Sequence, residues 1–264
     1  MNNVYSLCKS DIERQLNVNY DNIILLDTVD STNSYCKAHK NNLGTQSLVV
    51  SLEQTAGRGR QGKSFFSPAN RGLYFTMALK RSESPSNIAK YTILVAVAVV
   101  RTISALTQHR PSIKWVNDIF VNDKKTAGIL CECTYNNDCT ATDTIIIGVG
   151  INLKNGDFPL DIANIATTLD VNVDINTIIA HLANNIYNTI YSTNQSELIE
   201  EYKSYSIVLH KTISFTLNDI AQTGTVVDIL PDGALVLDMG GKLTTINCGE
   251  ISLGSSDYIN KQKL

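Results

Sequence analysis

A loop in which glycines and cations alternate, residues 57–64, holds the densest group of chemically active side chains in the sequence. Arg58, Arg60 and Lys63 each stand next to a glycine, in a chain whose formal net charge is -3. Glycine lets backbone N–H groups approach an anion closely, and arginine adds bidentate, charge-assisted hydrogen bonds. The loop therefore predicts a segment that orders over an anionic ligand such as a carboxylate or a phosphate.

The letters of the same loop also satisfy two phosphate-binding motifs, GxxxxGK[ST] and GxGxxG. Both motifs need a helix directly after the loop, because the phosphate binds at the N-terminus of that helix. Pro68 and Gly72 follow here and disfavour a helix, and strand-like residues come next. We expect neither a P-loop nor a dinucleotide fold. The alternative to an anion-binding loop is a solvated basic loop, or a loop that contacts RNA as RGG segments do.

Further segments extend the pattern on both sides of the loop. They are Asp30-Ser31-Thr32-Asn33, Gln54-Thr55-Ala56-Gly57, Lys114-Trp115-Val116-Asn117-Asp118, Lys125-Thr126-Ala127-Gly128-Ile129-Leu130 and Gly148-Val149-Gly150-Ile151-Asn152. In order and approximate spacing, over about residues 25–152, this series resembles the biotin–protein ligases of the monofunctional type. The resemblance implies an enzyme that activates biotin with ATP to biotinyl-5′-AMP. It then transfers the biotinyl group to a lysine of a biotin carboxyl carrier protein.

The resemblance also implies roles for the matching residues. The implied biotin-binding residues are Ser31, Thr32, Asn33, Gln54, Gly57, Arg58, Gly59, Arg60, Lys125 and Gly128. The implied ATP-binding residues are Arg58, Arg60, Phe65, Asn117, Lys125 and Asn152, and the implied catalytic residues are Arg60, Lys125, Lys114 and Asp118. No metal ligand set is implied, because Mg²⁺ would be carried mainly by the ATP phosphates, with Asp118 as a candidate partner.

Elementary chemistry supports these cations independently. A carboxylate that attacks the α-phosphate of ATP brings two anionic reactants together, so positive side chains must screen them and hold them in line. Plainer roles stand beside the chemical ones: Ser31 and Thr32 would also serve as helix caps, and Trp115 as a core residue. Glu132, which flanks the motifs, would be a solvated residue at the sheet. Two departures from the family pattern, Val116 for proline and Phe65 for tryptophan, are expected to leave activity intact.

Strands and helices that must position these residues follow from apolar patterning. We predict strands at residues 22–29, 46–52, 72–80, 119–121, 126–131 and 144–151, and helices from about residue 31, at 87–108, 175–191 and 195–205. Short strands at residues 213–216, 224–230, 234–237 and 243–246, with turns at 217–219, 231–233 and 239–241, predict a small β-barrel. With the resemblance, the predicted fold class is α+β. A mixed-sheet, class II-synthetase-like catalytic domain (residues 1–209) is followed by an SH3-like barrel (residues 210–264).

Composition limits the remaining function classes. Hydrophobic residues make up 43% and charged residues 18% of 264 residues, which is ordinary for a globular protein with a core. The negative net charge gives no support to a nucleic-acid partner, and the apolar stretch at residues 91–100 is too short to span a membrane. The six cysteines lack zinc-site spacing, so we expect free thiols. We expect a cytoplasmic protein with no membrane partner. The sequence does not decide whether the protein forms a homodimer.

Three other functions compete with the ligase. A lipoate–protein ligase shares the fold and the adenylate chemistry, but its Arg-Arg-x-Ser-Gly-Gly-Gly stretch is missing from this sequence. A biotin-sensing repressor needs a DNA-binding winged helix, for which the twenty or so residues before the first strand are too few. A catalytically silent nucleotide-binding protein would not need both Arg60 and Lys125. The sequence therefore favours the biotin ligase.

Overall fold

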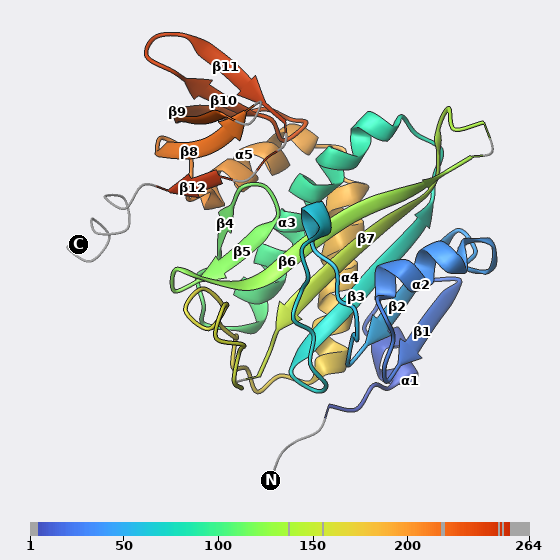
Figure 1. Ribbon diagram of the computed structural model, residues 1–264. Coiled ribbons are helices and arrows are strands. Elements are labelled where there is room, and N and C mark those ends of the chain that lie inside the picture. Colours follow the sequence, from blue (N-terminus) through green and yellow to red (C-terminus); the bar gives the residue numbers. More distant parts are fainter. Residues whose placement is uncertain are drawn as a thin grey trace.

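A mixed seven-stranded sheet forms the middle of the computed structural model (Figure 1). Across the sheet the strands are β1 (Asn22–Leu26), β2 (Gln46–Ser51), β3 (Gly72–Lys80), β7 (Thr142–Asn152), β6 (Lys124–Tyr135), β5 (Asp118–Val121) and β4 (Ser112–Lys114). β1 and β2 pair in parallel and the other neighbours pair antiparallel. The structure describes residues 5–136, 138–154, 156–217, 220–247, 249 and 251–253.

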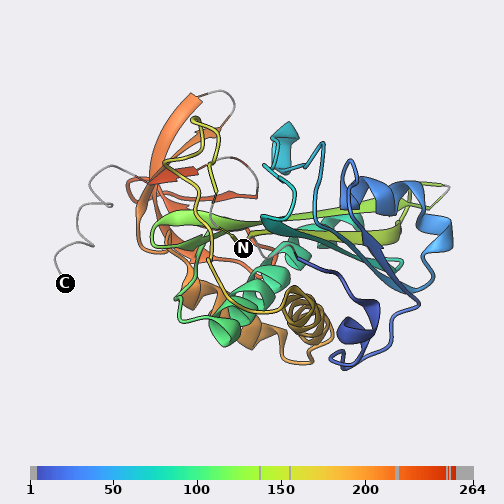
Figure 2. The same cartoon turned by 90° about the horizontal axis from the view of Figure 1, so that it is seen from below.

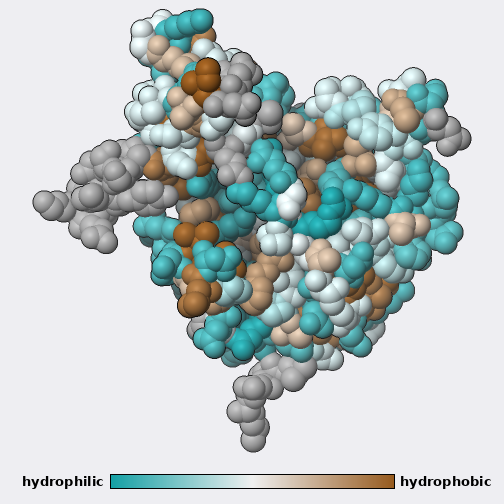
Figure 3. Space-filling view, in the orientation of Figure 1, coloured by the Kyte–Doolittle hydropathy of each residue, from teal (hydrophilic) through white to brown (hydrophobic). Residues whose placement is uncertain are grey.

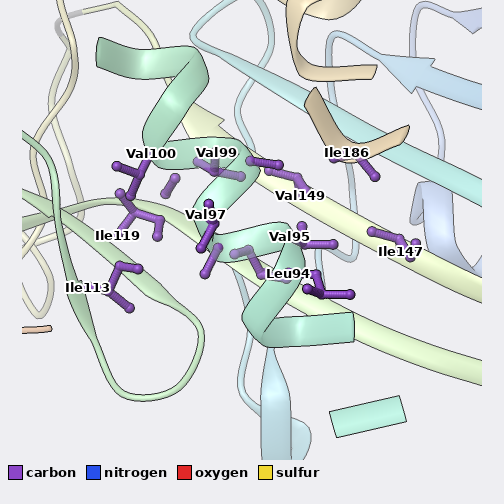
Figure 4. Close-up of a cluster of buried hydrophobic side chains, with 14 of the residues drawn as sticks. Leu94, Val95, Val97, Val99, Val100, Ile113, Ile119, Ile147, Val149 and Ile186 are labelled. Carbon is purple, nitrogen blue, oxygen red and sulfur yellow. The ribbon is translucent and has the colours of Figure 1, made fainter. Parts of the chain in front are cut away.

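One face of the sheet is covered by the two longest helices, α3 (Ile88–Leu106) and α4 (Ile175–Ile190), as the view from below shows (Figure 2). Every residue from 91 to 100 on α3 is buried, as the apolar run in the sequence predicts. Val95, Val97 and Val99 pack among Ile147 and Val149 of the sheet (Figure 4). The single turn η3 (Pro85–Asn87) precedes α3, and α1 (Lys9–Glu13) and α5 (Gln195–Tyr205) complete this side.

The segment 85–106 is long and apolar enough, by length and composition alone, to cross a membrane. In this fold, however, 67% of its most apolar stretch is buried inside the protein. A helix that packs on a sheet with most of its surface is a core helix, and its apolar composition follows from burial on several faces.

The opposite face of the sheet carries α2 (Thr32–Ala38) and the turn η1 (Lys40–Asn42). A second, smaller apolar cluster joins Cys36 of α2 and Leu43 to Val49, Ala78 and Ile146 of the sheet. Burial raises the pKa of the Cys36 thiol to about 12, so this cysteine stays protonated at neutral pH. The cysteines within the described part of the chain are free thiols, and Cys248 lies outside it.

A five-stranded antiparallel sheet follows α5, in the order β11 (Leu243–Ile246), β10 (Leu235–Asp238), β9 (Ile220–Ile229), β8 (Thr212–Leu217) and β12 (Ile251–Leu253). Its strands gather at the upper left of Figure 1, around α5. An α+β fold in which a mixed-sheet unit precedes a small β unit is therefore confirmed. The boundary between residues 209 and 210 stays a prediction, and the first strand of the second sheet begins at Thr212.

Most elements lie within a few residues of their predicted bounds, and the differences have local causes. β6 continues to Tyr135, beyond the predicted end at residue 131, because β7 pairs with it along its whole polar end. The hairpin before it turns on Asn122 and Asp123, which both have positive φ, so β6 begins at Lys124. The helix α1 and the three-residue strand β12 carry too little periodicity to be predicted. The predicted turn at residues 217–219 lies partly outside the described residues.

Candidate active site

A cavity of about 220 Å³ opens on the face of the sheet that carries α2. The predicted site residues that line it are Ser31, Thr32, Asn33, Gln54, Arg58, Gly59, Arg60, Phe65, Lys114, Asn117, Asp118, Lys125 and Gly128. They come from α2, from the loop after β2, and from β4, β5 and β6. This is the face seen in Figures 1 and 3, where the loop crosses in front of the sheet and polar side chains gather over it. The fold thus brings distant motifs of the sequence to one place.

Glycines on neighbouring strands make the floor of the cavity. In β7, Ile146, Gly148 and Gly150 alternate toward this face, while the residues between them face α3. A Cβ on Gly148 would lie 2.3 Å from Asn33 Oδ1, and one on Gly150 would lie 2.5 Å from the ring of Phe65. Glycine in a strand commonly marks such a close approach. The two positions therefore let a side chain of α2 and a side chain of the loop rest directly on the sheet.

A polar network occupies one end of the cavity. Gln54 Oε1 accepts hydrogen bonds from the backbone N–H of Thr32 at 2.9 Å and from its hydroxyl at 3.2 Å. The hydroxyl of Thr76, fully buried on β3, lies 2.8 Å from Thr32 Oγ1 and 2.7 Å from Asn33 Oδ1. Ser31 is the N-cap of α2 and its side chain accepts from the backbone N–H of Ser34. Ser31 thus caps α2 and lines the cavity at the same time. The network holds several polar groups in fixed positions, which suits a neutral polar ligand.

Cationic side chains surround the middle of the cavity. Lys125 Nζ lies 2.7 Å from Asp118 Oδ1 and 5.9 Å from the centre of the Phe65 ring. Arg60 donates to Asn117 Oδ1 at 3.4 Å, and Asn117 in turn donates to the carbonyl of Ile129 at 3.1 Å. These contacts hold the loop and the sheet around one space in which an anion would meet several positive charges.

Two predicted residues lie outside this cavity. Gly57 forms the neck of the loop, where a Cβ would lie 2.3 Å from the carbonyl oxygen of Phe65. Asn152 ends β7, donates to the carbonyl of Thr167 at 3.1 Å, and lines a second, much smaller pocket beside Phe66. The implied role of Gly57 in biotin binding and that of Asn152 in adenine binding stay predictions.

The sequence predicts that Glu132 is exposed to solvent, but in the structure its side chain is mostly buried and hydrogen-bonded. Its side chain is 17% exposed and accepts from Asn33 Nδ2 at 2.9 Å, Lys37 Nζ at 2.6 Å and Arg58 at 3.1 Å. Burial raises the pKa of this carboxyl group, but the hydrogen bonds from Lys37 and Asn33 and the charges of Lys37 and Arg58 outweigh burial and lower the pKa overall. The carboxylate is therefore ionised at neutral pH.

A pH dependence of stability follows from Glu132. A carboxyl group whose pKa is lower in the folded than in the unfolded protein stabilises the fold above its ordinary pKa, and this contribution is lost as the pH falls through the folded value. We expect Glu132→Gln to cost about 2 kcal/mol in the free energy of unfolding at pH 7. The gap between the two proteins should close below pH 4.5, the ordinary pKa of the group. Urea unfolding of both proteins at several pH values measures it, and a gap of constant size down to pH 3 would contradict this assignment.

The C-terminal sheet touches the segment that carries Asn117 and Asp118. The indole N–H of Trp115, 5% exposed, donates to the carbonyl of Gly233 at 2.6 Å. Gly233 sits in the turn between β9 and β10 with φ +88°, a conformation that favours glycine. Trp115 is thus a core residue, as expected, but it also lines the cavity and links the two sheets.

Replacing Trp115 with phenylalanine tests this link. The ring stays buried, but the carbonyl of Gly233 loses its donor, so we expect a loss of about 1–3 kcal/mol in the free energy of unfolding. Because Trp115 is the one tryptophan of the chain, circular dichroism rather than fluorescence should follow urea unfolding. A variant as stable as the parent would mean that solvent or another donor satisfies that carbonyl.

Several residues around the cavity were missed in the sequence. They are Gln61, Ser64, Tyr74, Phe75, Thr76, Leu130, Glu132, Gly148, Gly150, Gly249 and Ile251. Lys63, one of the three loop cations expected to meet an anion, also lines the cavity. Gly148 and Gly150 belong to a recognised motif, and their alternation within a strand is a signal for close approach to the floor. Thr76, a polar residue at an inward position of an apolar strand, is a similar signal. No local signal identifies Gly249 or Ile251, which reach the cavity only because the C-terminal sheet packs beside it.

Comparison with known proteins agrees with this geometry. Residues 25–152 match the model of the biotin/lipoate A/B protein ligase family. The chain is 37% identical over 150 residues to a bifunctional ligase/repressor BirA of Bacillus spizizenii, a match covering 56% of this chain but only 46% of that protein. It is 26% identical over 216 residues, 77% of each chain, to a biotin–[acetyl-CoA-carboxylase] ligase of Mycobacterium tuberculosis. A biotin protein ligase of Aquifex aeolicus, solved in complex with biotin and ATP, has a TM-score of 0.71 with 25% identity, covering 89% of this chain and 99% of that one.

Proposed function

Because the chain belongs to the biotin/lipoate A/B protein ligase family, we propose that it is a biotin–protein ligase. It would activate biotin with ATP to biotinyl-5′-AMP and transfer the biotinyl group to a lysine of a biotin carboxyl carrier domain. The observation that carries the proposal is one cavity with a polar end, a glycine floor and a cationic middle. The Aquifex aeolicus protein of similar fold binds biotin and ATP together.

The cavity residues divide between the two substrates. The polar group formed by Ser31, Thr32, Asn33 and Gln54 would receive the ureido ring of biotin, because it offers both donors and acceptors at fixed positions. The carboxylate of biotin would then lie toward Lys125 and the loop. Phe65, which rests on the glycine floor near Lys125, offers an aromatic face to the adenine ring.

In the first step a carboxylate oxygen of biotin attacks the α-phosphorus of ATP. A P–O bond forms, the bond to the β-phosphate oxygen breaks, and pyrophosphate leaves with the electron pair. The attacking carboxylate and the triphosphate repel each other, so Arg58, Arg60 and Lys125 lower the barrier by screening charge where it develops. The fixed geometry supplies the alignment that the displacement needs.

In the second step the neutral amine of the acceptor lysine attacks the acyl carbon of the mixed anhydride. An amide bond forms, the acyl–phosphate bond breaks, and AMP leaves. The amine loses a proton, for which the carboxylate of Asp118 is a candidate acceptor at the wall of the cavity. Until then the loop at residues 57–64 would protect the anhydride from water.

Magnesium fits this site only as a companion of the nucleotide. Among the described residues, no group of three His, Cys, Asp or Glu side chains could hold a metal ion. Asp118 is the acidic side chain at the cavity, and it lies 2.7 Å from Lys125. A Mg²⁺ ion bound to the phosphates would add charge screening, with Asp118 as its partner on the protein.

The acceptor follows from the same proposal. The Mycobacterium tuberculosis relative is named for acetyl-CoA carboxylase, so the carrier domain of a biotin-dependent carboxylase is the proposed partner. We further propose a cytoplasmic enzyme with no nucleic-acid or membrane partner. Whether it forms a homodimer can be measured by sedimentation at micromolar concentration.

The proposal is tested by the intact mass of a biotin carboxyl carrier domain after incubation with the protein, ATP, Mg²⁺ and biotin. A parallel tube contains lipoate in place of biotin. We expect a biotinyl mass increase in the biotin tube alone. An increase with lipoate alone would assign the chain to the lipoate-using branch, and no increase in either tube, with a competent carrier, would leave a nucleotide-binding protein without ligase activity.

A further inference from the structure

Glu132 joins three parts of the chain that lie far apart in sequence. Its carboxylate accepts hydrogen bonds from Asn33 and Lys37 of α2 and from Arg58 of the loop after β2. Asn33 and Arg58 line the cavity, whereas Lys37 and Glu132 itself do not. Glu132 therefore stands behind the site, in contact with two of the residues that face it.

Arg58 and Arg60 attach the loop to the sheet through their side chains. Its backbone hydrogen bonds, such as Gly59 N to the carbonyl of Lys63 at 2.7 Å and Phe65 N to the carbonyl of Gly57 at 2.9 Å, close the loop on itself. Its arginines reach outward: Arg60 donates to Asn117 at a long 3.4 Å, and Arg58 to the charged Glu132 at 3.1 Å. A bond between two charged groups is the stronger kind, so the Arg58–Glu132 pair is the firmer of these two attachments.

We propose that Glu132 is a positioning residue of the ligase reaction, acting through Arg58. It holds Arg58, and with it the loop at residues 57–64, over the end of the cavity where Asn33 lies, before any ligand arrives. The inference rests on the proposed function for its kinetic consequence, but the placement of the loop can be tested without catalysis. A merely structural Glu132 would instead serve to fasten α2 through Lys37.

Trypsin provides the measurement that is independent of activity. The loop contains cleavage sites after Arg60 and Lys63, and a loop released from the sheet is cut faster because proteolysis needs a mobile backbone. We expect Glu132→Gln to raise the rate of cleavage at these sites, followed by mass spectrometry in the native protein, about fivefold or more. Arg58→Ala should do the same, without disturbing the buried Asn33.

Two variants serve as matched controls. Lys37→Met removes the other cation on Glu132, and Asp143→Asn removes a carboxylate of similar exposure that pairs with Lys40 at 3.3 Å away from the cavity. Neither residue belongs to the cavity, so both variants should be cleaved and should bind biotin like the parent. If Lys37→Met accelerates cleavage as much as Glu132→Gln does, Glu132 fastens α2 and the proposal is wrong.

Biotin binding by calorimetry completes the test with a double-mutant cycle. We expect Glu132→Gln to weaken biotin binding about tenfold, and to have no further effect once Arg58 is alanine, because the two changes remove one interaction. Additive effects would overturn the proposal. If even the parent fails to bind biotin, the proposed function fails, and the tryptic rates still decide whether Glu132 holds the loop. Unchanged cleavage in both Glu132→Gln and Arg58→Ala would show that it does not.

Discussion

Replacing Lys125 with methionine is expected to slow formation of biotinyl-5′-AMP by about 10²–10³-fold, because the variant loses a preorganised charge at the reacting groups. Lys125 projects from β6 into the middle of the cavity, 2.7 Å from Asp118 and near the Phe65 ring. Methionine keeps much of the length of the side chain and removes only the ammonium group. The exchange of labelled pyrophosphate into ATP in the presence of biotin measures the first step alone.

The neighbouring lysine gives the control for this prediction. Lys124 begins β6, pairs with Val121 across the hairpin and does not line the cavity. Lys124→Met removes the same charge one residue away, so we expect exchange within about twofold of the parent. Equal losses in the two variants would mean that net charge near the hairpin, rather than the placed ammonium group, controls the rate.

Replacing Arg60 with glycine is expected to shorten the time for which the adenylate stays bound by about 10–10²-fold, the effect of losing one or two hydrogen bonds to a charged group. Arg60 lies on the turn η2 (Arg60–Gly62), lines the cavity and contacts Asn117 from the loop side. The adenylate should still form, since Lys125 and Arg58 remain. Rapid filtration of the enzyme with labelled biotin and ATP gives the rate of release.

Arg60→Ala separates the loss of charge from the added freedom of a glycine. Both variants remove the guanidinium group, but alanine restricts the backbone more. We expect the alanine variant to release the adenylate nearly as fast. If both variants hold the adenylate as long as the parent does, Arg60 has no role in retaining the adenylate.

Local patterns were enough for most of the elements. The apolar run of residues 72–80 is short enough for a strand that is buried on both faces of the sheet. The longer apolar run of α3 fits a helix that lies between the sheet and a second helix. Likewise Ser31 followed by Thr32 and Asn33 predicts a helix start, because the cap satisfies free backbone donors there. β12 was not predicted because a strand of three residues is too short to show a periodic pattern.

The loop at residues 57–64 shows how far sequence context can correct a motif. Its letters match two phosphate-binding fingerprints, yet Pro68 and the strand that follows rule out the helix that both of them require. In the structure the loop closes on itself and returns to β3 without a helix of more than three residues. The residues that follow the loop therefore predicted its shape, and the anion binding that its cations and glycines indicate stays a prediction.

The sequence by itself determined which side chains could do chemistry here, because cations, glycines and amides keep their properties wherever the chain places them. Only the tertiary structure decided how they meet. Glu132 looked like a solvated strand residue, and pairing of β6 with β7 aims it instead at Asn33 and Arg58, nearly 100 and more than 70 positions away. Gly249 reaches the cavity, while Asn152 turns to Thr167 outside it. Such outcomes depend on strand register and on how two sheets pack, and these are set by burial summed over the whole chain rather than by any local run of residues.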